Sequence, residues 1–522
     1  MNIKKLLGLT DDMRIGTTSS SPYTGSPTFD KIPFHIDAKR KPALNVYVVV
    51  ERDDPEILHY GRIIEGTEEN PRAEPGRLQQ NQAYQIGQRD PRPGDQAPHV
   101  TRIMQIEVLG EIHGDEDKTQ TLDDVTVEEP STLAQTGKAV YRLSPSYVPW
   151  LLGIPTSPDD GLDIGFAESG DVSVPFILPM EAVARHLAVA GKTGVGKSYF
   201  GGVLVEELHR KNIPVVVFDV LGDMLRATED LGGHTLWAGR DLRIPYSVLG
   251  ITEFLNFIPN LTRDQSELVA LAYEEVFGEA LDTLDSSGEV SIPLERLLEK
   301  IRDAAAAFGQ DPVGERAARR VQAAIRRNTL LTTRTEAWLK QLAEKPITNI
   351  FVGHLGQDAR NLVVGATARI LQIMRRRGRI PPLVVVIDEA HLFLPAGHEI
   401  TPSTHVVREM VRTARHDAIG IVLITQSPSS MDKQVFLTCN TRIVFALDKE
   451  DLNLVSGTMG DLPQETIDRI PKQAKGVAII SSSMDIMRHP ARVRIRRRHT
   501  REGAPTPNLA EEVKLWRKQK NA

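Results

Sequence analysis

The residues with the clearest chemistry are Gly191 to Ser198, which read GKTGVGKS. This octapeptide matches G-x-x-x-x-G-K-[ST], in which glycines let the backbone wrap around phosphate groups. The apolar run 187–190 predicts a buried strand before it, and the residues from Ser198 onward predict a helix after it. That context favours a phosphate-binding loop over a glycine-rich turn without a ligand. We therefore expect ATP here, with Lys197 on the β- and γ-phosphates and the Ser198 hydroxyl on Mg²⁺.

A second apolar run, 383–387, ends in two acids, Asp388 and Glu389. A hydrophobic strand followed by such a pair is typical of a Walker B element. Asp388 would bind Mg²⁺ through water, and Glu389 would orient and polarise the attacking water. A strand ending in a solvated turn is the alternative. The string continues to His391 and spells the DEAH box of one helicase superfamily, but no matching arginine motif follows, so His391 is interpreted as a loop residue.

Other polar residues are expected around these two elements. Gln426 ends the next predicted strand and is placed to sense the γ-phosphate. Arg408, Arg412 and Arg415 recur on one helical face, either as a solvated basic face or as a source of an arginine finger for the next subunit. Arg415, at the helix end, is the best candidate, and Arg185 is a second candidate for neutralising phosphate charge. The full set expected to bind the nucleotide is Gly191, Thr193, Gly194, Val195, Gly196, Lys197, Ser198, Tyr199, Asp219 and Arg185.

The composition of the chain limits the classes of function that are possible. The chain has 522 residues and a net charge of −6, which excludes a globally basic nucleic-acid coat but not a local basic channel. Two basic clusters, 375–379 and 494–498, could touch DNA, although solvated strand ends are the favoured interpretation. The single cysteine, Cys439, excludes a disulfide framework. No long apolar stretch predicts a membrane span, so we expect no membrane partner and a cytoplasmic protein.

The elements that must position these residues divide the chain into five parts. The fold class expected is α/β, a RecA-like P-loop ATPase core with an N-terminal small β-barrel and a helical insertion. Short strand-like segments with Pro/Gly turns predict the barrel, and helical periodicity without strand signals predicts the insertion. The boundaries expected are a flexible arm at 1–28, the barrel at 29–165, the core at 166–260 and 346–500, the insertion at 261–345 and a tail helix at 501–522.

Several stretches in this order resemble the HerA family: HLAVAGKTGVGKS, VVVFDVLGD, VVVIDEAH, RTARHDAIGIVLITQSPS and the final AKGVAIISS with HPARVRI. The resemblance covers roughly residues 30–500. It implies a hexameric ATP-driven DNA translocase with a HAS-type barrel. Matched position by position, it implies roles for Lys197, Ser198, Asp219, Asp388, Glu389, Gln426 and Arg415 as given above. The turn 220–223 departs from the Pro-His-Gly-Glu-like turn of relatives, which leaves the role of Asp223 open.

The resemblance carries two functional hypotheses. In the first, a homo-hexamer drives double-stranded DNA through its central channel into a partner nuclease of the NurA type during DNA end processing. In the second, the ring scaffolds and activates an antiphage defence effector, either a Sir2-type NAD-degrading subunit or a nuclease. In both, the partner is expected to dock on the β-barrel side. A membrane-anchored conjugation or partition motor of the FtsK type is a third hypothesis, disfavoured by the lack of a predicted membrane span.

Overall fold

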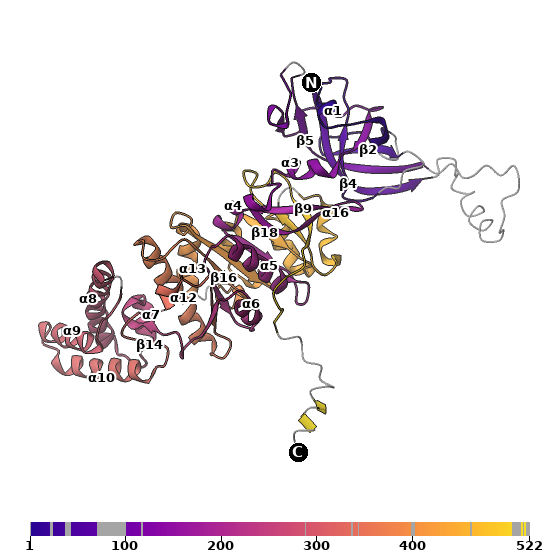
Figure 1. The fold of residues 1–522 in the computed structure, drawn as a ribbon. Helices are drawn as coiled ribbons and strands as arrows, with labels where there is room; N and C mark the ends of the chain where they lie inside the picture. Colours follow the sequence, from indigo (N-terminus) through magenta and orange to yellow (C-terminus); the bar gives the residue numbers. More distant parts are fainter. Residues whose placement is uncertain are drawn as a thin grey trace, which may run out of the picture.

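A computed structural model describes the chain except for residues 1, 21–24, 37–42, 70–100, 116–117, 288, 336–337, 343, 398–401, 460–461, 504–512, 515 and 518–522. Along the long axis of the molecule lie, in order, an N-terminal barrel, a central α/β core and a bundle of three helices (Figure 1). No helix among the described residues combines the length and apolarity that a membrane span needs. Most of the expected tail helix lies outside the described residues.

The N-terminal domain is a closed antiparallel barrel. Its sheet order is β2-β1-β7-β3-β4-β5, and pairing of β2 with β5 closes it, with β6 added at the edge of β5. Closure leaves no edge strand inside the barrel itself. The strands are β1 (Arg14–Thr18), β2 (Lys31–Ile36), β3 (Tyr47–Val50), β4 (Ile57–Glu69), β5 (Thr101–His113), β6 (Thr126–Glu128) and β7 (Ala139–Arg142).

The expected flexible arm at 1–28 is wrong for most of its length. Strand β1 pairs with both β2 and β7, so it is an integral barrel strand. Helix α1 (Ile3–Leu6) packs on the same domain, with Ile3 only 1% exposed. The arm's Ser/Thr/Gly composition suggested disorder, but pairing with a strand more than 100 residues later stabilises it.

The core is built on an eleven-stranded sheet in the order β12-β15-β11-β16-β17-β10-β18-β19-β20-β8-β9. The first seven strands in this order, up to and including β18, pair with one another in parallel. The pairs from β18 onward are antiparallel. The central strands β10, β11 and β16 each have at least four consecutive apolar residues, as strands covered on both faces should. Strands β12, β15 and β18 include polar residues. The bounds of the parallel strands are β10 (Leu187–Ala190), β11 (Val215–Asp219), β12 (His234–Trp237), β15 (Ile347–Phe351), β16 (Leu383–Ile387), β17 (Ile419–Thr425) and β18 (Thr441–Val444).

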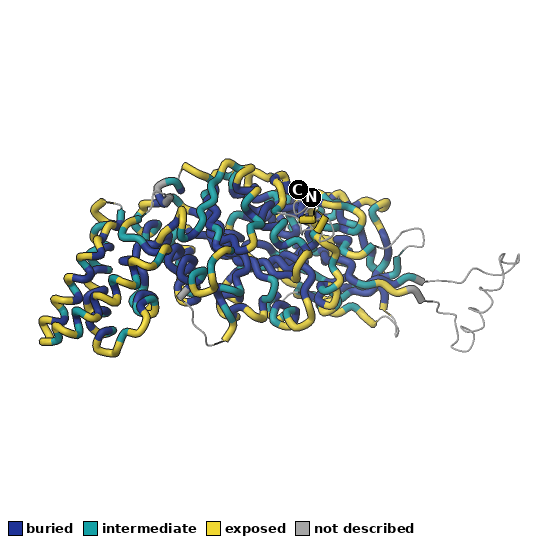
Figure 2. Tube along the Cα trace, turned by 90° about the horizontal axis from the view of Figure 1, so that it is seen from below, coloured by how far each residue is buried: buried dark blue, intermediate teal, exposed yellow. Residues whose placement is uncertain are grey.

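The antiparallel part of the sheet corrects one boundary. Strands β8 (Gly161–Ser169) and β9 (Val172–Pro179) form a hairpin that pairs with β20 (Ala491–Ile495), which in turn pairs with β19 (Val477–Ser481). The segment 161–165, expected to end the barrel, therefore begins the core instead. Figure 2 shows buried backbone running continuously through this sheet.

Helices flank the sheet or project from it. Those that matter for the site are α5 (Lys197–Arg210), α6 (Leu225–Asp230), α12 (Gln357–Arg376), α13 (Pro402–Thr413) and α14 (Lys433–Thr438). The shorter ones are α3 (Val148–Leu152), α4 (Met180–Ala184), α7 (Ile251–Asn256), α11 (Trp338–Gln341), α15 (Lys449–Ser456) and α16 (Gln464–Ile467). The insertion consists of α8 (Arg263–Ser287), α9 (Leu294–Ala307) and α10 (Asp311–Arg327), followed by β14 (Leu331–Thr332), which pairs with β13 (Ile244–Pro245).

Barrel and core are joined by a buried polar contact. Arg62 on β4 forms an ion pair with Glu107 on β5 and donates from Nη1 to the Pro490 carbonyl, 2.9 Å away. Tyr60 Oη lies 2.6 Å from His489 Nε2, and both residues are buried. The barrel is therefore fixed to the loop before β20 rather than tethered by a linker.

Candidate nucleotide-binding site

The loop from Gly191 to Ser198 connects β10 to α5, as its sequence predicts. Gly194 and Gly196 have φ of +80° and +119°, a conformation that side-chain-bearing residues rarely adopt. Lys197 is buried and its Nζ donates to the Lys192 carbonyl at 3.1 Å, so the ammonium lies inside the curve of the loop. Burial lowers the pKa of Lys197, and the nearby charges of Glu389 and Asp388 oppose that shift. The loop has the shape and the charge that bind a polyphosphate.

The two expected Walker B acids lie beside Lys197. Both are buried, and Glu389 has a left-handed backbone with φ of +49°. Burial, with the charges of Glu389 and Asp219, raises the pKa of Asp388 to about 8, and burial also raises the pKa of Glu389. Asp388 Oδ2 and Glu389 Oε2 make no hydrogen bond to any described residue. Buried carboxylate oxygens without a hydrogen-bond partner fit a divalent cation, because a cation would stabilise the charged form of the carboxylates.

Gln426 lies where its sequence position predicted. Strand β17 separates the Walker B strand β16 from the P-loop strand β10, so its C-terminal end faces both. Gln426 Oε1 accepts a hydrogen bond from Thr193 Oγ1 at 2.8 Å. The amide of one strand end therefore contacts the phosphate loop directly. Parallel strands end at one edge of a sheet, which is why residues more than 200 positions apart meet here.

Asp219 has a different role from the one expected. It is fully buried at the end of β11, where its carboxylate accepts from the backbone N–H groups of Gly222 and Met224 at 2.7 and 3.1 Å. Asn349 Nδ2 is a further donor, at 3.3 Å. Both carboxylate oxygens hold the turn after β11, so the residue shapes this turn rather than offering itself to a nucleotide. That turn carries Asp223, whose charge acts on Lys197, Asp388 and Glu389.

Arg185 and Arg415 lie at the opposite edge of the sheet. Arg185 precedes β10 and forms an ion pair with Asp485. Arg415 is exposed just before β17, and its charge acts on His186, which also precedes β10. In a parallel sheet the N-terminal strand ends lie a full strand length from the phosphate loop. The expectation that Arg415 emerges on the γ-phosphate side of its own sheet is therefore wrong, and Arg185, the second candidate for neutralising phosphate charge, also lies away from the phosphate loop of its own chain.

The other expected basic groups have partners in this chain or lie in solvent. Arg408 forms an ion pair with Asp432 before α14, and Arg412 is exposed. Two of the four arginines in each basic cluster form ion pairs with described residues, which reduces the charge that either cluster can offer to DNA. The pairs are Arg376–Asp417, Arg377–Asp285, Arg494–Glu168, Arg496–Glu206 and Arg496–Glu207.

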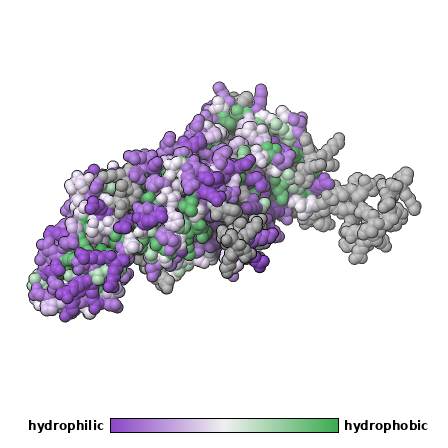
Figure 3. Space-filling model, turned by 60° about the horizontal axis from the view of Figure 1, so that its bottom comes forward, coloured by the Kyte–Doolittle hydropathy of each residue, from purple (hydrophilic) through white to green (hydrophobic). Residues whose placement is uncertain are grey.

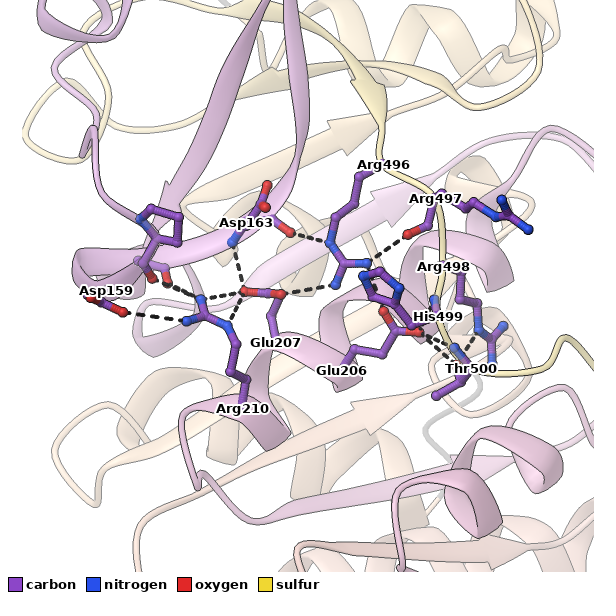
Figure 4. A network of polar contacts seen from close by, with 12 residues as sticks. Asp159, Asp163, Glu206, Glu207, Arg210, Arg496, Arg497, Arg498, His499 and Thr500 are labelled. Carbon is purple, nitrogen blue, oxygen red and sulfur yellow. Dashed lines mark hydrogen bonds and ion pairs between the residues drawn. The ribbon is translucent and has the colours of Figure 1, made fainter.

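The last of these pairs belong to a segment that sequence analysis missed. Residues 496–503, here called the C-terminal strap, follow β20 and run along α5 (Figure 4). Arg496 contacts Glu206 and Glu207 at 2.8 and 3.0 Å, and Thr500 donates twice to Glu206. Tyr199, expected to contact the nucleotide, instead accepts from the strap's Arg498 N–H through its hydroxyl, at 2.6 Å. No local pattern in the sequence could have joined residues nearly 300 positions apart.

His391 is a second residue that the sequence left aside. Its Nδ1 lies 3.4 Å from Glu389 Oε2 and 3.3 Å from Thr425 Oγ1, at the end of β17. Burial lowers the pKa of His391, and the positive charge of Lys197 lowers it further. A neutral imidazole thus packs against the acid expected to polarise water.

One protein family and several known proteins are similar to this chain. A family profile described as "Helicase HerA, central domain" matches residues 162–371, which contain the phosphate loop and the Asp219 turn. Over this part of its length the chain is similar to the HerA family. A probable helicase of Methanocaldococcus jannaschii is 24% identical over 95% of this chain and 94% of its own length. A HerA named a DNA double-strand break repair helicase, from Sulfurisphaera tokodaii, is 22% identical over 68% of this chain and 73% of its own length.

Solved structures add little to the similarity with the HerA family. VirB4 of Thermoanaerobacter pseudethanolicus aligns at 18% identity over 65% of this chain and 96% of that chain, with a TM-score of 0.49. That score is too low to carry an argument about this chain. The fold expected from the sequence, a P-loop ATPase core with an N-terminal barrel and a helical insertion, is confirmed by the sheet topology described above and by the family match.

Proposed function

We propose that this chain forms a homo-hexamer that hydrolyses ATP with Mg²⁺ and drives double-stranded DNA through a central channel. In this proposal it acts with a nuclease of the NurA type, docked on the barrel side, in DNA end processing. The observation that carries the proposal is the meeting of Lys197, Glu389 and Gln426 at the C-terminal edge of three adjacent strands. Relatives named DNA double-strand break repair helicases support DNA as the substrate.

Each residue then has a physical task. Lys197 stabilises the negative charge of the β- and γ-phosphates, since its ammonium lies buried inside the loop. Ser198 and Asp388 would hold Mg²⁺, which neutralises phosphate charge when bound. Glu389 orients water and accepts its proton, and Gln426, hydrogen-bonded to Thr193, links the state of the phosphate loop to β17.

The position of the arginines supports a ring assembly. The exposed Arg415 is at the sheet edge opposite the phosphate loop, so it cannot reach the nucleotide of its own chain. An arginine finger from this position must act on another copy. Head-to-tail contacts of this kind close into rings when the rotation between subunits permits.

Hydrolysis is tested with Lys197→Ala and Glu389→Gln in the full chain. Both should lower DNA-stimulated ATP turnover by roughly a hundredfold or more, because each removes a contact used in the transition state. Glu389→Gln should still bind ATP, because the loop is intact. Lys211→Ala is the matched control: it removes the same side chain at the other end of α5, where Lys211 contacts the Asp159 carbonyl. Wild-type turnover in both site variants would refute the assignment.

Translocation and the partner need separate measurements. Displacement of a triplex-forming strand from duplex DNA should require ATP and fail in Glu389→Gln. Native mass measurement should give a hexamer. Co-purification with a nuclease encoded beside this chain should depend on exposed barrel residues. Turnover without any strand displacement would leave an ATPase but overturn the translocase.

A further inference from the structure

The helical insertion carries an exposed basic face that none of the contacts above explain. Helix α10 contains five arginines, and all five are exposed. We call them the arginine stripe: Arg316, Arg319, Arg320, Arg326 and Arg327. At about 100° per residue they fall on one side of the helix. The opposite side, with Ala317, Val321 and Ile325, is buried against the rest of the bundle.

The stripe is poorly paired within the chain. Arg316, Arg320 and Arg327 form no ion pair with any described residue. Arg319 lies 3.9 Å from Glu315, which is itself held more closely by Arg302 at 2.6 Å. Arg326 has only a 3.9 Å contact with Glu295. In each of the two basic clusters of the core, by comparison, two of the four arginines form ion pairs, at distances of 2.6 to 3.1 Å that are shorter than any in the stripe.

The acids of the same bundle are only partly engaged. On α8, four acids pair with cations of their own chain, at distances from 2.5 to 3.0 Å: Glu267 with Arg263, Glu275 with Lys300, Glu279 with Arg296 and Asp285 with Arg377. Asp264, Glu274 and Asp282 are exposed and form no ion pair with any described residue. Because these three acids are scattered among engaged ones, the regular phosphates of a polyanion match the stripe better, and contact with a neighbouring bundle is the alternative that the test separates.

Its dimensions fit duplex DNA. From Arg316 to Arg327 the helix rises about 16 Å, more than the roughly 12 Å width of a major groove, so the row can contact phosphates on both sides of a groove. Guanidinium groups bind phosphate oxygens in pairs. The chain has a net charge of −6, so the stripe is a local concentration of charge and not a result of overall composition.

We propose that the arginine stripe of α10 is a sequence-independent docking site for the phosphate backbone of duplex DNA, separate from the ring channel. This rests on the proposed function, in which DNA is the substrate. The stripe lies at the end of the molecule farthest from the barrel, and the surface there is strongly hydrophilic (Figures 1 and 3). DNA would therefore contact each subunit on the side opposite the expected nuclease.

The test compares two full-length variants that lose the same charge. Arg316→Gln, Arg320→Gln and Arg327→Gln are combined in one, and glutamine preserves helix propensity. The control combines Lys5→Gln, Arg14→Gln and Lys118→Gln, which are exposed residues of the barrel domain. Binding of a duplex of about 40 base pairs is measured by fluorescence anisotropy without nucleotide, over a range of salt concentrations.

The stripe variant should bind at least about tenfold more weakly near 0.1 M salt, and the slope of log K against log salt should fall by about 2 to 3. Replacing the same three arginines by lysine should retain most of the slope. An unchanged slope, or an equal loss in the barrel control, overturns the proposal. Altered subunit assembly with unaltered DNA affinity also overturns it, and assigns the stripe to a contact between copies.

The outcome is separable from the proposed function. Helix α10 lies far from α5, the helix that begins with Lys197 (Figure 1), so turnover of ATP without DNA should be equal in the wild type, the stripe variant and the control. A wild-type protein that binds DNA through the stripe but does not hydrolyse ATP would overturn the proposed function and leave this inference standing.

Discussion

Asp388 and Glu389 are consecutive acids in a buried site, and their environment explains how each can be used. Burial raises the pKa of both, so without a compensating cation their charged forms are unfavourable. Lys197 opposes this for Glu389, because its positive charge lowers the pKa of that acid. Glu389 also has a left-handed backbone, a conformation that costs free energy and persists only where the surrounding structure holds it. Neighbouring residues must therefore keep Glu389 in place.

His391 is the neighbour best placed to do so. Its imidazole touches Glu389 Oε2 and Thr425 Oγ1, and we expect it to act as a positioning residue. His391→Ala should lower kcat roughly tenfold with little change in KM, because a small misplacement of the acid weakens only the transition state. His391→Asn, which keeps a nitrogen near Nδ1, should recover much of kcat. Equal falls in both variants, or a rise in KM alone, would contradict this role.

At the scale of elements, the strap and α5 form one unit. The phosphate loop opens α5, and the strap pairs its Arg496 with Glu206 and Glu207 on that helix, while Glu207 also accepts from the Asp163 N–H of β8. Gly202 allows the close approach: a Cβ there would lie 2.2 Å from Arg498 Cζ. The contacts hold the helix that positions Lys197 and Ser198 against the antiparallel edge of the sheet.

Removing the positive charge of Arg496 should therefore destabilise the core. Arg496→Met leaves the buried Glu206 without a cation and removes one of the two cations of Glu207, which keeps Arg210. Breaking a buried ion pair in this way typically costs about 3 to 5 kcal/mol. Arg494→Met is the control, because Arg494 is about half exposed and pairs with Glu168 at the surface, where the loss should stay within about 1 kcal/mol. Denaturant unfolding followed by circular dichroism compares the two. Equal midpoints for Arg496→Met and wild type would show that the buried pairs contribute nothing net.

At the scale of the whole molecule, the contact between barrel and core contains a titratable group. Burial, with the charges of Arg62 and Arg488, lowers the pKa of His489 to about 4. The unfolded chain protonates this histidine near pH 6.5 and the folded chain does not, so its contribution is fully present above pH 6.5 and is lost as pH falls. At pH 5 the loss is about 2 kcal/mol.

His489→Gln should remove this part of the acid sensitivity. The variant should be less stable than wild type at pH 8, because the 2.6 Å contact with Tyr60 is lost. Between pH 6.5 and 5, however, its thermal midpoint should fall less steeply. His416→Gln, at an exposed position before β17, is the control and should retain the wild-type slope. If the thermal midpoints of wild type and His489→Gln fall equally between pH 6.5 and 5, this histidine is not a source of the acid sensitivity.

A second prediction for the whole molecule concerns how its subunits assemble. Because Arg415 lies at the edge opposite its own phosphate loop, we expect it to serve the neighbouring subunit. Arg415→Ala and Lys197→Ala should each be nearly inactive alone. In an equal mixture about a quarter of the interfaces combine an intact loop with an intact Arg415, and part of the turnover should return.

The control for mixing is a protein with both substitutions. Added to Arg415→Ala, it supplies no intact finger, so turnover should stay low. Restoration in that mixture as well would point to an effect unrelated to Arg415. Near-normal turnover in Arg415→Ala alone would move the role to Arg412, or to Arg185 if its pair with Asp485 opens in the ring.

The sequence predicts the phosphate loop, the Walker B acids, the position of Gln426 and the α/β core. These are local patterns: glycines at fixed offsets, apolar runs and the residues that end them, all placed by the rule that parallel strands end at one edge. It also predicted the barrel and the helical insertion, because strand and helix periodicities differ over short windows.

How the charged residues are used depends on contacts between segments that lie far apart in the sequence. Arginines at 375–379 and on α10 look alike in the sequence, yet the former meet Asp285 and Asp417 and the latter meet little within the described chain. Pairing of β1 with β7 ordered a segment whose composition suggested disorder. Asp219 turned inward to its own loop, and Arg496 found Glu206 across the chain. In each case the deciding partner is distant in sequence, so no local pattern could reveal whether a charge is paired, buried or free.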